Sequence, residues 1–475
     1  MKKYKELFKN LGLLTISNFG SKILTFLLVP LYTNVLTIGE YGTYDLYITT
    51  TLLLSPVLSL NIADAVMRFA LEKGRNQRDV FAVGFIRILT AISVFTVVVS
   101  LNYAFDIIPV FNQFPFFLWL YFALSLTYDF LTQFTKGMDK ISDLAVAGLL
   151  NSATTVALNI LFLLVIKIGL TGYFLANCLA FIVPIIYLTL RLKTYKMLNI
   201  KFKDKPLKKE MERYSTPIIF NTISWWINNV SDRYIITWIL GVEANGIYSV
   251  AYKIPSVLNV FQSIFSQAWT ISAIKEFDDE NKKFYSSIYK VYNFSMVFVC
   301  SVLLLFNQLI AKILFAKEFY EAWKYAPFLL ISVVFGSLSG FLGGVFSAAK
   351  KSTTFAKTTI VGAVINIVLN IALVIKMGAI GAAIATLISY FIVWASRFYE
   401  ANKIIKFEIN LKRDFVSYLI LLAQAIIMVL VSNYIIKYIS IIVLLIILIL
   451  INLSEFKTLI NKVVEAFNKF RKKAN

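Results

Sequence analysis

Residues 17–47, SNFGSKILTFLLVPLYTNVLTIGEYGTYDLY, hold the end of one long apolar segment, a short polar stretch and the start of a second apolar segment. Gly39 and Gly42 flank Glu40 in the polar stretch, and glycine is typical of tight turns. Lys22 lies well inside the first apolar segment, where a charge is costly and usually functional. The stretch therefore predicts two membrane-spanning helices joined by a tight turn at Gly39–Gly42.

Two parts of this pattern return in the second half of the chain. Ile38–Tyr44 (IGEYGTY) is matched by Val242–Tyr248 (VEANGIY), and Ile166–Gly172 (IKIGLTG) is matched by Ile375–Gly381 (IKMGAIG). Both pairs occur in the same order and at the same place among the expected helices. They predict two six-helix bundles that are parallel repeats, an arrangement that places a substrate site between the bundles.

The composition is that of a membrane protein. Of 475 residues, 59% are hydrophobic and 15% charged, and the mean hydropathy is +0.75. Average soluble domains have about 25% charged residues. We expect an all-α polytopic membrane protein with about 14 transmembrane helices, because apolar segments of about 20 residues cross a bilayer. The expected spans are residues 11–37, 43–71, 80–104, 113–135, 142–166, 170–190, 214–240, 244–273, 286–310, 325–348, 354–375, 378–400, 414–435 and 438–455.

The positive charges indicate the orientation of these spans. With the N-terminus in the cytoplasm, the inner segments hold 36 Lys and Arg and the outer loops hold 6. This asymmetry follows the positive-inside rule and predicts a multi-pass protein of the cytoplasmic membrane with both termini cytoplasmic. It also assigns the net charge of +21 to topology and anionic lipid rather than to nucleic acid.

The organisation follows from the spans and the repeat. We expect an N-terminal lobe over residues 1–200, a C-terminal lobe over 201–403, and a final part over 404–475 with two helices and a basic cytoplasmic tail. The basic linker 193–213 lies between the lobes. Both cysteines fall in apolar segments and the chain has no histidine, so we expect neither an enzyme nor a metal or other cofactor.

At these residues the sequence resembles the oligosaccharide flippases of the polysaccharide-transport family (the Wzx type), in the MOP superfamily that includes the MATE drug transporters and lipid II flippases. The resemblance is densest at Ser17–Lys22, Val29–Tyr32, Glu40–Leu46, Asp232–Arg233 and Gly241–Tyr248. It implies that the protein flips a polyprenyl-diphosphate-linked oligosaccharide, of the undecaprenyl type, by alternating access between two lobes. We also expect a monomer that contacts membrane lipids and uses H⁺ or Na⁺ as a coupling ion.

Charges inside the expected spans are the candidate site residues. Four cations are candidates for binding the diphosphate, since cations offset the cost of moving this anion out of water: Lys22, Arg87, Arg233 and Lys253. Four amides are candidates for lining a polar cavity: Asn18, Asn221, Asn228 and Asn229. Asp129 is the candidate ion-coupling residue. Asp64 and Arg68 lie four apart on one helix and are expected to form a structural pair.

Other interpretations of the same residues stay open. Lys22 can pair with Asp129, Arg87 can reach the membrane surface, and the polar side chains can serve helix packing. A lipid II flippase is the nearest alternative function. A multidrug or cation antiporter of the MATE type is disfavoured because cations outnumber acids inside the spans, by five to four.

Overall fold

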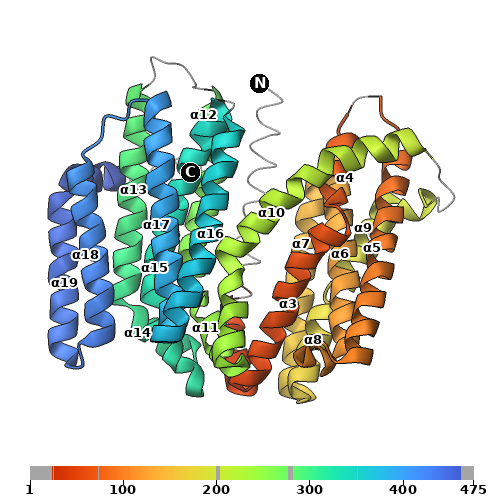
Figure 1. The fold of residues 1–475 in the computed structure, drawn as a ribbon, viewed down its shortest axis with the longest axis horizontal. Helices are drawn as coiled ribbons and strands as arrows, with labels where there is room; N and C mark the ends of the chain where they lie inside the picture. Colours follow the sequence, from red (N-terminus) through yellow and green to blue (C-terminus); the bar gives the residue numbers. More distant parts are fainter. Residues whose placement is uncertain are drawn as a thin grey trace, which may run out of the picture. The chain divides into compact units, whose positions relative to one another are not determined.

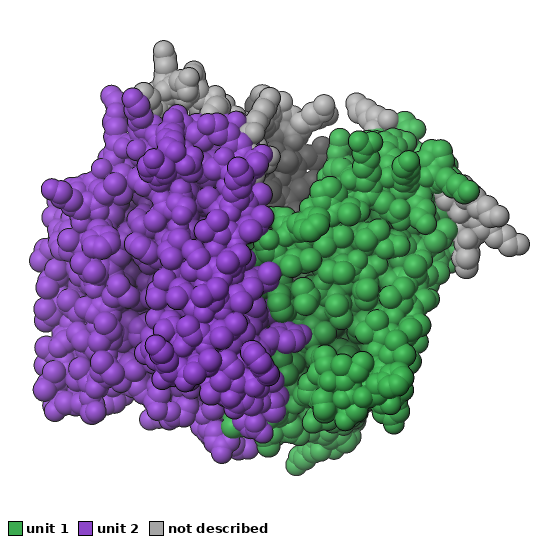
Figure 2. Space-filling view, viewed as in Figure 1, with its two compact units in different colours: residues 1–226 green, residues 227–475 purple. Residues whose placement is uncertain are grey.

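In the computed structural model, the described residues are 24, 26–72, 74–198, 204–275, 282–349 and 351–461. All regular elements in these ranges are helical, which agrees with the predicted all-α fold (Figure 1). The chain divides into two compact units, one ending at Trp226 and the other beginning at Ile227 (Figure 2). The expected three-part division at residues 200 and 403 stays a prediction.

The first unit contains the helices from α2 to α9 and the beginning of α10. Their bounds are α2 Val29–Val35, α3 Ile38–Leu58, α4 Ile62–Ala70, α5 Gln77–Phe105, η1 Pro109–Asn112, α6 Pro115–Gly137, α7 Ile141–Ile160, η2 Leu161–Val165, α8 Gly169–Leu179, α9 Ile182–Leu192 and η3 Thr194–Lys196. α10 (Lys205–Leu240) starts in this unit, where Glu210 accepts from Arg75 at 2.7 Å.

The second unit contains the end of α10 and all later helices. Their bounds are α11 Val242–Ala251, α12 Lys253–Lys275, α13 Lys282–Leu305, α14 Asn307–Leu314, η4 Lys317–Lys324, α15 Ala326–Ala348, α16 Ser352–Met377, α17 Ala379–Ile404, α18 Leu411–Leu430 and α19 Tyr434–Ile451. α15 is the central helix of this unit and buries most of its residues, because α12, α13 and α17 pack around it.

Many of these helices have the length and composition of membrane spans. Within the described ranges, nine pass this test, or ten when α3 and α4 count as one broken span bent by 59°. Each expected span from the second onward coincides with one helix or with two consecutive helices. The first expected span, 11–37, falls mostly outside the described residues, so the number fourteen stays a prediction.

The predicted glycine turn at Gly39–Gly42 is wrong. The chain turns at Leu36 and Thr37, and α3 begins directly afterwards at Ile38. Thr37 forms a capping box with Glu40: the Glu40 N–H donates to Thr37 Oγ1 at 3.2 Å, and the Thr37 N–H donates to Glu40 Oε2 at 2.8 Å. These bonds satisfy otherwise unpaired donors at the helix start, so the glycines continue the helix.

The matching stretch in the second unit also begins a helix. α11 starts at Val242, immediately after Gly241, whose φ of 95° is a conformation that favours glycine. The repeated sequence therefore marks the starts of α3 and α11. The last tyrosine of each copy packs inward: Tyr44 is half-buried against Tyr173 with ring centroids 4.1 Å apart, and Tyr248 is fully buried.

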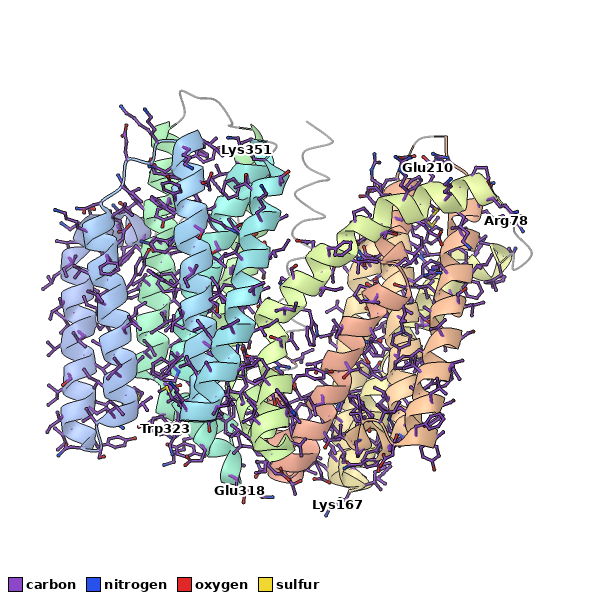
Figure 3. All side chains as sticks on the ribbon, viewed as in Figure 1. Arg78, Lys167, Glu210, Glu318, Trp323 and Lys351 are labelled. Carbon is purple, nitrogen blue, oxygen red and sulfur yellow. The ribbon has the colours of Figure 1, made fainter. Side chains whose placement is uncertain are left out.

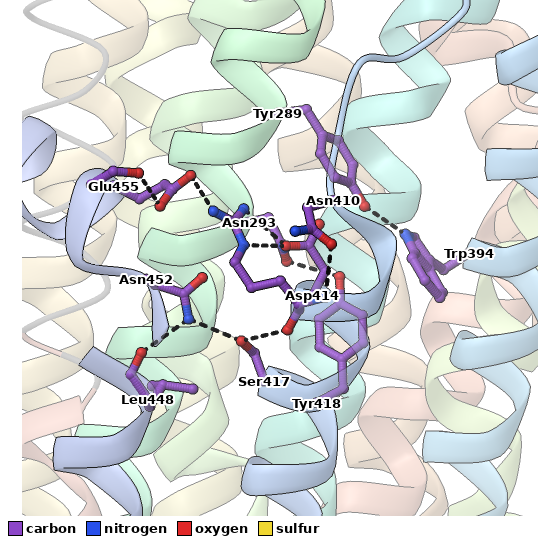
Figure 4. Close-up of polar contacts among 12 residues, drawn as sticks. Tyr289, Asn293, Trp394, Asn410, Asp414, Ser417, Tyr418, Leu448, Asn452 and Glu455 are labelled. Atoms are coloured by element: carbon purple, nitrogen blue, oxygen red, sulfur yellow. Dashed lines mark hydrogen bonds and ion pairs between the residues drawn. The ribbon is translucent and has the colours of Figure 1, made fainter. Parts of the chain in front are cut away.

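The last two helices, α18 and α19, pack on the rest of the second unit through buried polar contacts (Figure 4). Tyr418 of α18 donates to Asn293 of α13 at 2.9 Å, and Asn452, just after α19, donates to Ser417 of α18 at 3.0 Å. Arg413 forms ion pairs with the carboxylates of Asp414, at 3.1 Å, and of Glu455. Buried polar groups need such partners, so these contacts specify how α18 and α19 dock.

Candidate functional site

Each unit has polar residues at its two ends. In the first unit, Arg78 and Glu210 lie at one end of the helices and Lys167 lies at the other (Figure 3). In the second, Lys351 lies at one end, and Glu318 and Trp323 lie at the other (Figure 3). The apolar helices between these ends are where an ionisable side chain indicates function.

Arg87 lies at the break between α3 and α4. Its Nη2 donates to the Leu58 carbonyl at 3.3 Å, and its Nε is buried without a hydrogen-bond partner. Leu58 is the last residue of α3, and Leu60 and Asn61 after it have left-handed φ angles of 53° and 51°. The break frees carbonyl groups at the end of α3, where a cation is stabilising. Arg87 therefore stabilises a broken helix, and one of its donors remains available.

Asp64 and Arg68, predicted to pair with each other, have other partners. Arg68 forms an ion pair with Glu72 at 3.4 Å, and Asp64 Oδ2 accepts from the Asn61 side chain at 2.7 Å. Glu72 is also four residues from Arg68 but follows the end of α4. Arg68 is half exposed, so it turns toward the open end of the helix rather than back toward Asp64.

Asp129, the candidate ion-coupling residue, lies on α6 and is exposed at the surface of the first unit. Gln133, one turn along the helix, is its hydrogen-bonding neighbour, and Lys136 donates to Gln133 at 3.2 Å. The three side chains form a short polar row on one helix face. The structure therefore gives Asp129 an accessible position with a cation two turns away.

Asp232 and Arg233 form a compact group with two tyrosines in the second unit. The buried Asp232 Oδ2 accepts from Tyr248 at 2.7 Å and from Tyr252 at 2.5 Å, and its Oδ1 accepts from the Arg233 N–H at 3.0 Å. The Arg233 guanidinium lies 5.1 Å from the centre of the Tyr252 ring. Adjacent residues on a helix point about 100° apart. Asp232 and Arg233 nevertheless both reach Tyr252, because Tyr252 lies at the break between α11 and α12.

The other predicted residues of the second unit lie around this group. Lys253 is half-buried at the start of α12. The Asn228 amide donates to the Thr359 carbonyl at 3.3 Å, and Asn229 accepts from Tyr390 at 2.6 Å. Asn221, on the part of α10 that belongs to the first unit, is exposed. Lys22 and Asn18 lie outside the described residues.

Sequence reasoning missed a second polar group, between α10, α16 and α17. The Asn366 Oδ1 accepts from the Ser231 hydroxyl at 3.4 Å and from the Asn370 amide at 3.0 Å. The Asn366 amide nitrogen lies 3.5 Å from Thr386 Oγ1. All four side chains are buried. The spacing of Asn366 and Asn370 placed both on one helix face, which is the signal that could have found them.

Arg397 was missed as well. The span expected over 378–400 includes it, yet the charge count placed it with the cytoplasmic segment. α17 continues to Ile404, so Arg397 lies inside the helix, and only 6% of it is exposed. The count of Lys and Arg treated hydrophilic residues near the end of a span as part of the loop. It therefore could not separate a buried arginine in the helix from an arginine in the loop.

The second unit thus presents amides, hydroxyls, aromatic rings and two arginines along α10, α16 and α17. Such a set can bind an anion through charge-assisted hydrogen bonds and a sugar through amides and rings. The described residues contain no group of three or more His, Cys, Asp or Glu side chains that could hold a metal ion.

Comparisons with known proteins agree with this architecture. The family described as polysaccharide biosynthesis protein matches residues 7–271. An uncharacterized membrane protein of Methanocaldococcus jannaschii is 24% identical over 182 residues, which is 37% of this chain and 36% of that protein. The match thus spans about a third of that relative's length.

Three solved structures resemble the chain in fold. The lipid II flippase MurJ, in an inward closed conformation, has a TM-score of 0.71 at 15% identity and covers 94% of this chain and 99% of its own. An inward-facing MATE multidrug transporter of the MOP superfamily has a TM-score of 0.67 at 14% identity, covering 81% and 94%. A MOP transporter from Pyrococcus furiosus scores 0.57 at 14% identity, covering 84% and 93%.

At these identities the solved structures show the fold alone, which is that of the MOP superfamily. The family match carries more, because it covers over half of the chain and includes the residues around Asp232 and Arg233. Those residues, together with the apolar helices, belong to one continuous stretch of family sequence. This multi-pass membrane protein is a member of the polysaccharide biosynthesis protein family.

Proposed function

We propose that this protein flips a polyprenyl-diphosphate-linked oligosaccharide, of the undecaprenyl type, across the cytoplasmic membrane for the synthesis of a cell-surface polysaccharide. The observation that carries the proposal is the family match over residues 7–271, which connects a MOP-type membrane protein with polysaccharide synthesis. The fold shared with a lipid II flippase supports the same class of transport, since lipid II is also a lipid-linked sugar.

The chemistry of the described residues suits this substrate. The diphosphate carries about two negative charges, and cations offset the cost of removing it from water. Arg87 keeps one buried donor without a partner, and Arg233 and Lys253 supply positive charge in the second unit. Lys22 is the fourth proposed diphosphate-binding residue. The amides Asn18, Asn221, Asn228 and Asn229 are the proposed sugar-facing groups.

The transport cycle we propose is alternating access between two lobes, with both termini in the cytoplasm. Asp129 is proposed to carry the coupling ion, H⁺ or Na⁺, because it is an accessible carboxylate within an apolar helix. Asp232 suits this role less well, because two tyrosine hydroxyls and a backbone N–H already occupy its oxygens. We propose that the protein acts as a monomer, without enzymatic chemistry or a cofactor.

A reconstitution experiment tests the function. Proteoliposomes receive a fluorescent undecaprenyl-diphosphate oligosaccharide in one leaflet, and a lectin added outside reports its arrival at the other leaflet. We expect lectin binding to appear only in vesicles that contain the protein. Parallel vesicles with lipid II, or with an organic dye cation under a proton gradient, test the two alternatives. Movement of the dye but not of the oligosaccharide would reject the flippase in favour of a multidrug antiporter.

A further inference from the structure

Arg397 is a buried cation whose partners are all neutral. Its Nε donates to Thr358 Oγ1 at 3.0 Å, its Nη1 to the Ser339 carbonyl at 3.0 Å, and its Nη2 to Thr359 Oγ1 at 2.7 Å. The Phe355 ring covers the guanidinium, with 4.1 Å between the ring centre and Cζ. Among the residues that the structure describes, no carboxylate forms an ion pair with Arg397.

A charge in this position has an energetic cost. Burying a guanidinium costs several kcal/mol even after relaxation, and buried charges are normally paired with an opposite charge. Three neutral hydrogen bonds and a ring contact offset only part of this cost. An intramembrane arginine that lacks an acidic partner therefore indicates that an anion is bound in the working protein.

The guanidinium keeps suitable donors for such an anion. It has five N–H groups, of which the three contacts above use one on each nitrogen. One N–H therefore remains on each terminal nitrogen, and two neighbouring donors are the fork that binds phosphate in a bidentate manner. The Ser339 hydroxyl, on the residue whose carbonyl already contacts Arg397, is buried without a hydrogen-bond partner. It is a further donor on the α15 residue that already contacts Arg397.

The location suits an anion that arrives from one membrane surface. Arg397 lies seven residues before the end of α17, or about 10 Å along the helix. Thr358 and Thr359 lie near the start of α16, at the same end of the unit as Lys351 (Figure 3). With the proposed topology, this end faces the cytoplasm.

We propose that Arg397 and the Ser339 hydroxyl form a binding site for a diphosphate group within the second unit. The site lies between α15, α16 and α17 and is made of residues other than Arg87, Arg233 and Lys253. Its identification with the diphosphate of a lipid-linked oligosaccharide rests on the proposed function. The same donors would also bind free inorganic pyrophosphate, so the test uses both sources.

The experiment measures binding to the full-length protein in nanodiscs by isothermal titration with inorganic pyrophosphate and with farnesyl diphosphate. We expect Arg397→Gln to weaken binding of both by about 10- to 100-fold, the usual effect of losing hydrogen bonds from a charged group. Ser339→Ala is expected to weaken binding several-fold, by about the value of one such bond. Lys403→Gln, which removes an exposed cation from the same helix, is the matched control and should bind like the wild type.

A merely structural arginine gives a different result. If Arg397→Gln unfolds at a lower temperature but binds both diphosphates with wild-type affinity, the proposal is overturned. Should Arg397→Gln fail to fold, Ser339→Ala and Arg397→Lys decide, because a diphosphate site requires weaker binding in Ser339→Ala and partial binding in Arg397→Lys. If farnesyl diphosphate binding depends on Arg397, the result supports a lipid-linked diphosphate as the ligand. If only pyrophosphate binding depends on Arg397, the result contradicts a lipid-linked ligand.

Failure of this inference is distinguishable from failure of the proposed function. If the protein flips the oligosaccharide but its diphosphate binding does not depend on Arg397, only the proposed Arg397 site is contradicted. If diphosphate binding depends on Arg397 but the protein flips no oligosaccharide, only the proposed function is contradicted.

Discussion

Asn159 and Asn370 occupy equivalent places in the two units. Asn159 donates its amide to the Thr155 carbonyl at 2.7 Å, and Asn370 donates its amide to the Asn366 carbonyl at 2.9 Å, four residues earlier in each case. Both side chains are fully buried, and the Oδ1 of each lacks a hydrogen-bond partner. The same unusual local geometry in both units is what a duplicated bundle produces, and it supports the internal repeat.

The two copies differ in the surroundings of this asparagine. Position 172 corresponds to 381 in the repeat, so the bulky Tyr173 corresponds to Ala382. In the first unit Tyr173 packs against Tyr32 and Tyr44, with ring centroids 4.5 and 4.1 Å apart. In the second unit the fully buried Ala382 lies on α17, four residues before Thr386 of the polar group around Asn366. The repeated segments therefore share a backbone pattern but differ in their side chains.

The topology is tested by cysteine labelling. With both cysteines replaced, a new cysteine at Glu243 or Lys167 should react with a membrane-impermeant maleimide added outside intact cells. A cysteine at Lys205 should react only after the membrane is permeabilised. Glu243 and Lys205 are exposed, so accessibility within the unit does not limit the reaction. Labelling of Lys205 from outside would contradict the parallel six-helix repeat.

Lys22 is predicted to meet the diphosphate. Lys22→Ala should abolish flipping in the lectin assay while the protein still inserts and accumulates, because the anion loses its compensating charge. Lys22→Arg should keep part of the activity, since charge survives while shape changes. If Lys22 instead pairs with Asp129, single mutants should lose yield and the double neutral mutant should recover it. Normal flipping by Lys22→Ala would reject the role in binding.

Arg87 is expected to affect both stability and transport. Arg87→Met removes the donor to the Leu58 carbonyl and should lower the free energy of unfolding by about 1–3 kcal/mol, the cost of an unsatisfied buried group. Thermal unfolding in detergent measures this loss. Arg87→Lys should recover stability while flipping stays reduced, because the single ammonium nitrogen of lysine lacks the planar guanidinium fork. Equal recovery of both properties would limit Arg87 to holding the helix break.

Asp232 is predicted to hold α10, α11 and α12 together. Asp232→Leu leaves the hydroxyls of Tyr248 and Tyr252 buried without their acceptor, at about 1–3 kcal/mol each. The yield of folded protein should fall sharply. The triple change that adds Tyr248→Phe and Tyr252→Phe should restore much of it, because no donor then lacks a partner. If the triple variant is no more stable than Asp232→Leu, the tyrosines are not the reason for the acid.

The C-terminal helices should loosen at low pH. Burial alone would raise the pKa of Glu455, but hydrogen bonds from Ser454 and Arg413 outweigh it and hold that pKa below its ordinary value of 4.5. A lowered pKa contributes stability that is present above the unfolded pKa and is lost as the pH falls through the folded one. Amide hydrogen exchange in the segment after residue 404, corrected for the intrinsic effect of pH on exchange, should therefore become faster below about pH 4.5. Glu455→Gln should exchange faster than the wild type already at pH 7 and show a smaller change as the pH falls.

The sequence alone determined the class of this protein, the approximate positions of its helices and their repetition. Hydrophobic length is a local property: about 20 apolar residues must be helical in a membrane wherever their neighbours lie. The same reasoning failed at Gly39–Gly42, since Thr37 and Glu40 form a capping box there and carry the helix through both glycines.

The partners of the charged residues were decided only by the tertiary structure. Arg68 had two acids within reach along the chain, and the path of the chain after α4 selected Glu72. Asn229 bonds Tyr390, which is 161 residues away, and no local pattern specifies which helices face each other over such a distance. Arg397 became a buried cation because α15 and α16 pack around the end of α17. Burial depends on these contacts between distant segments, so the sequence predicted the helices and the packing decided which of their charges are enclosed.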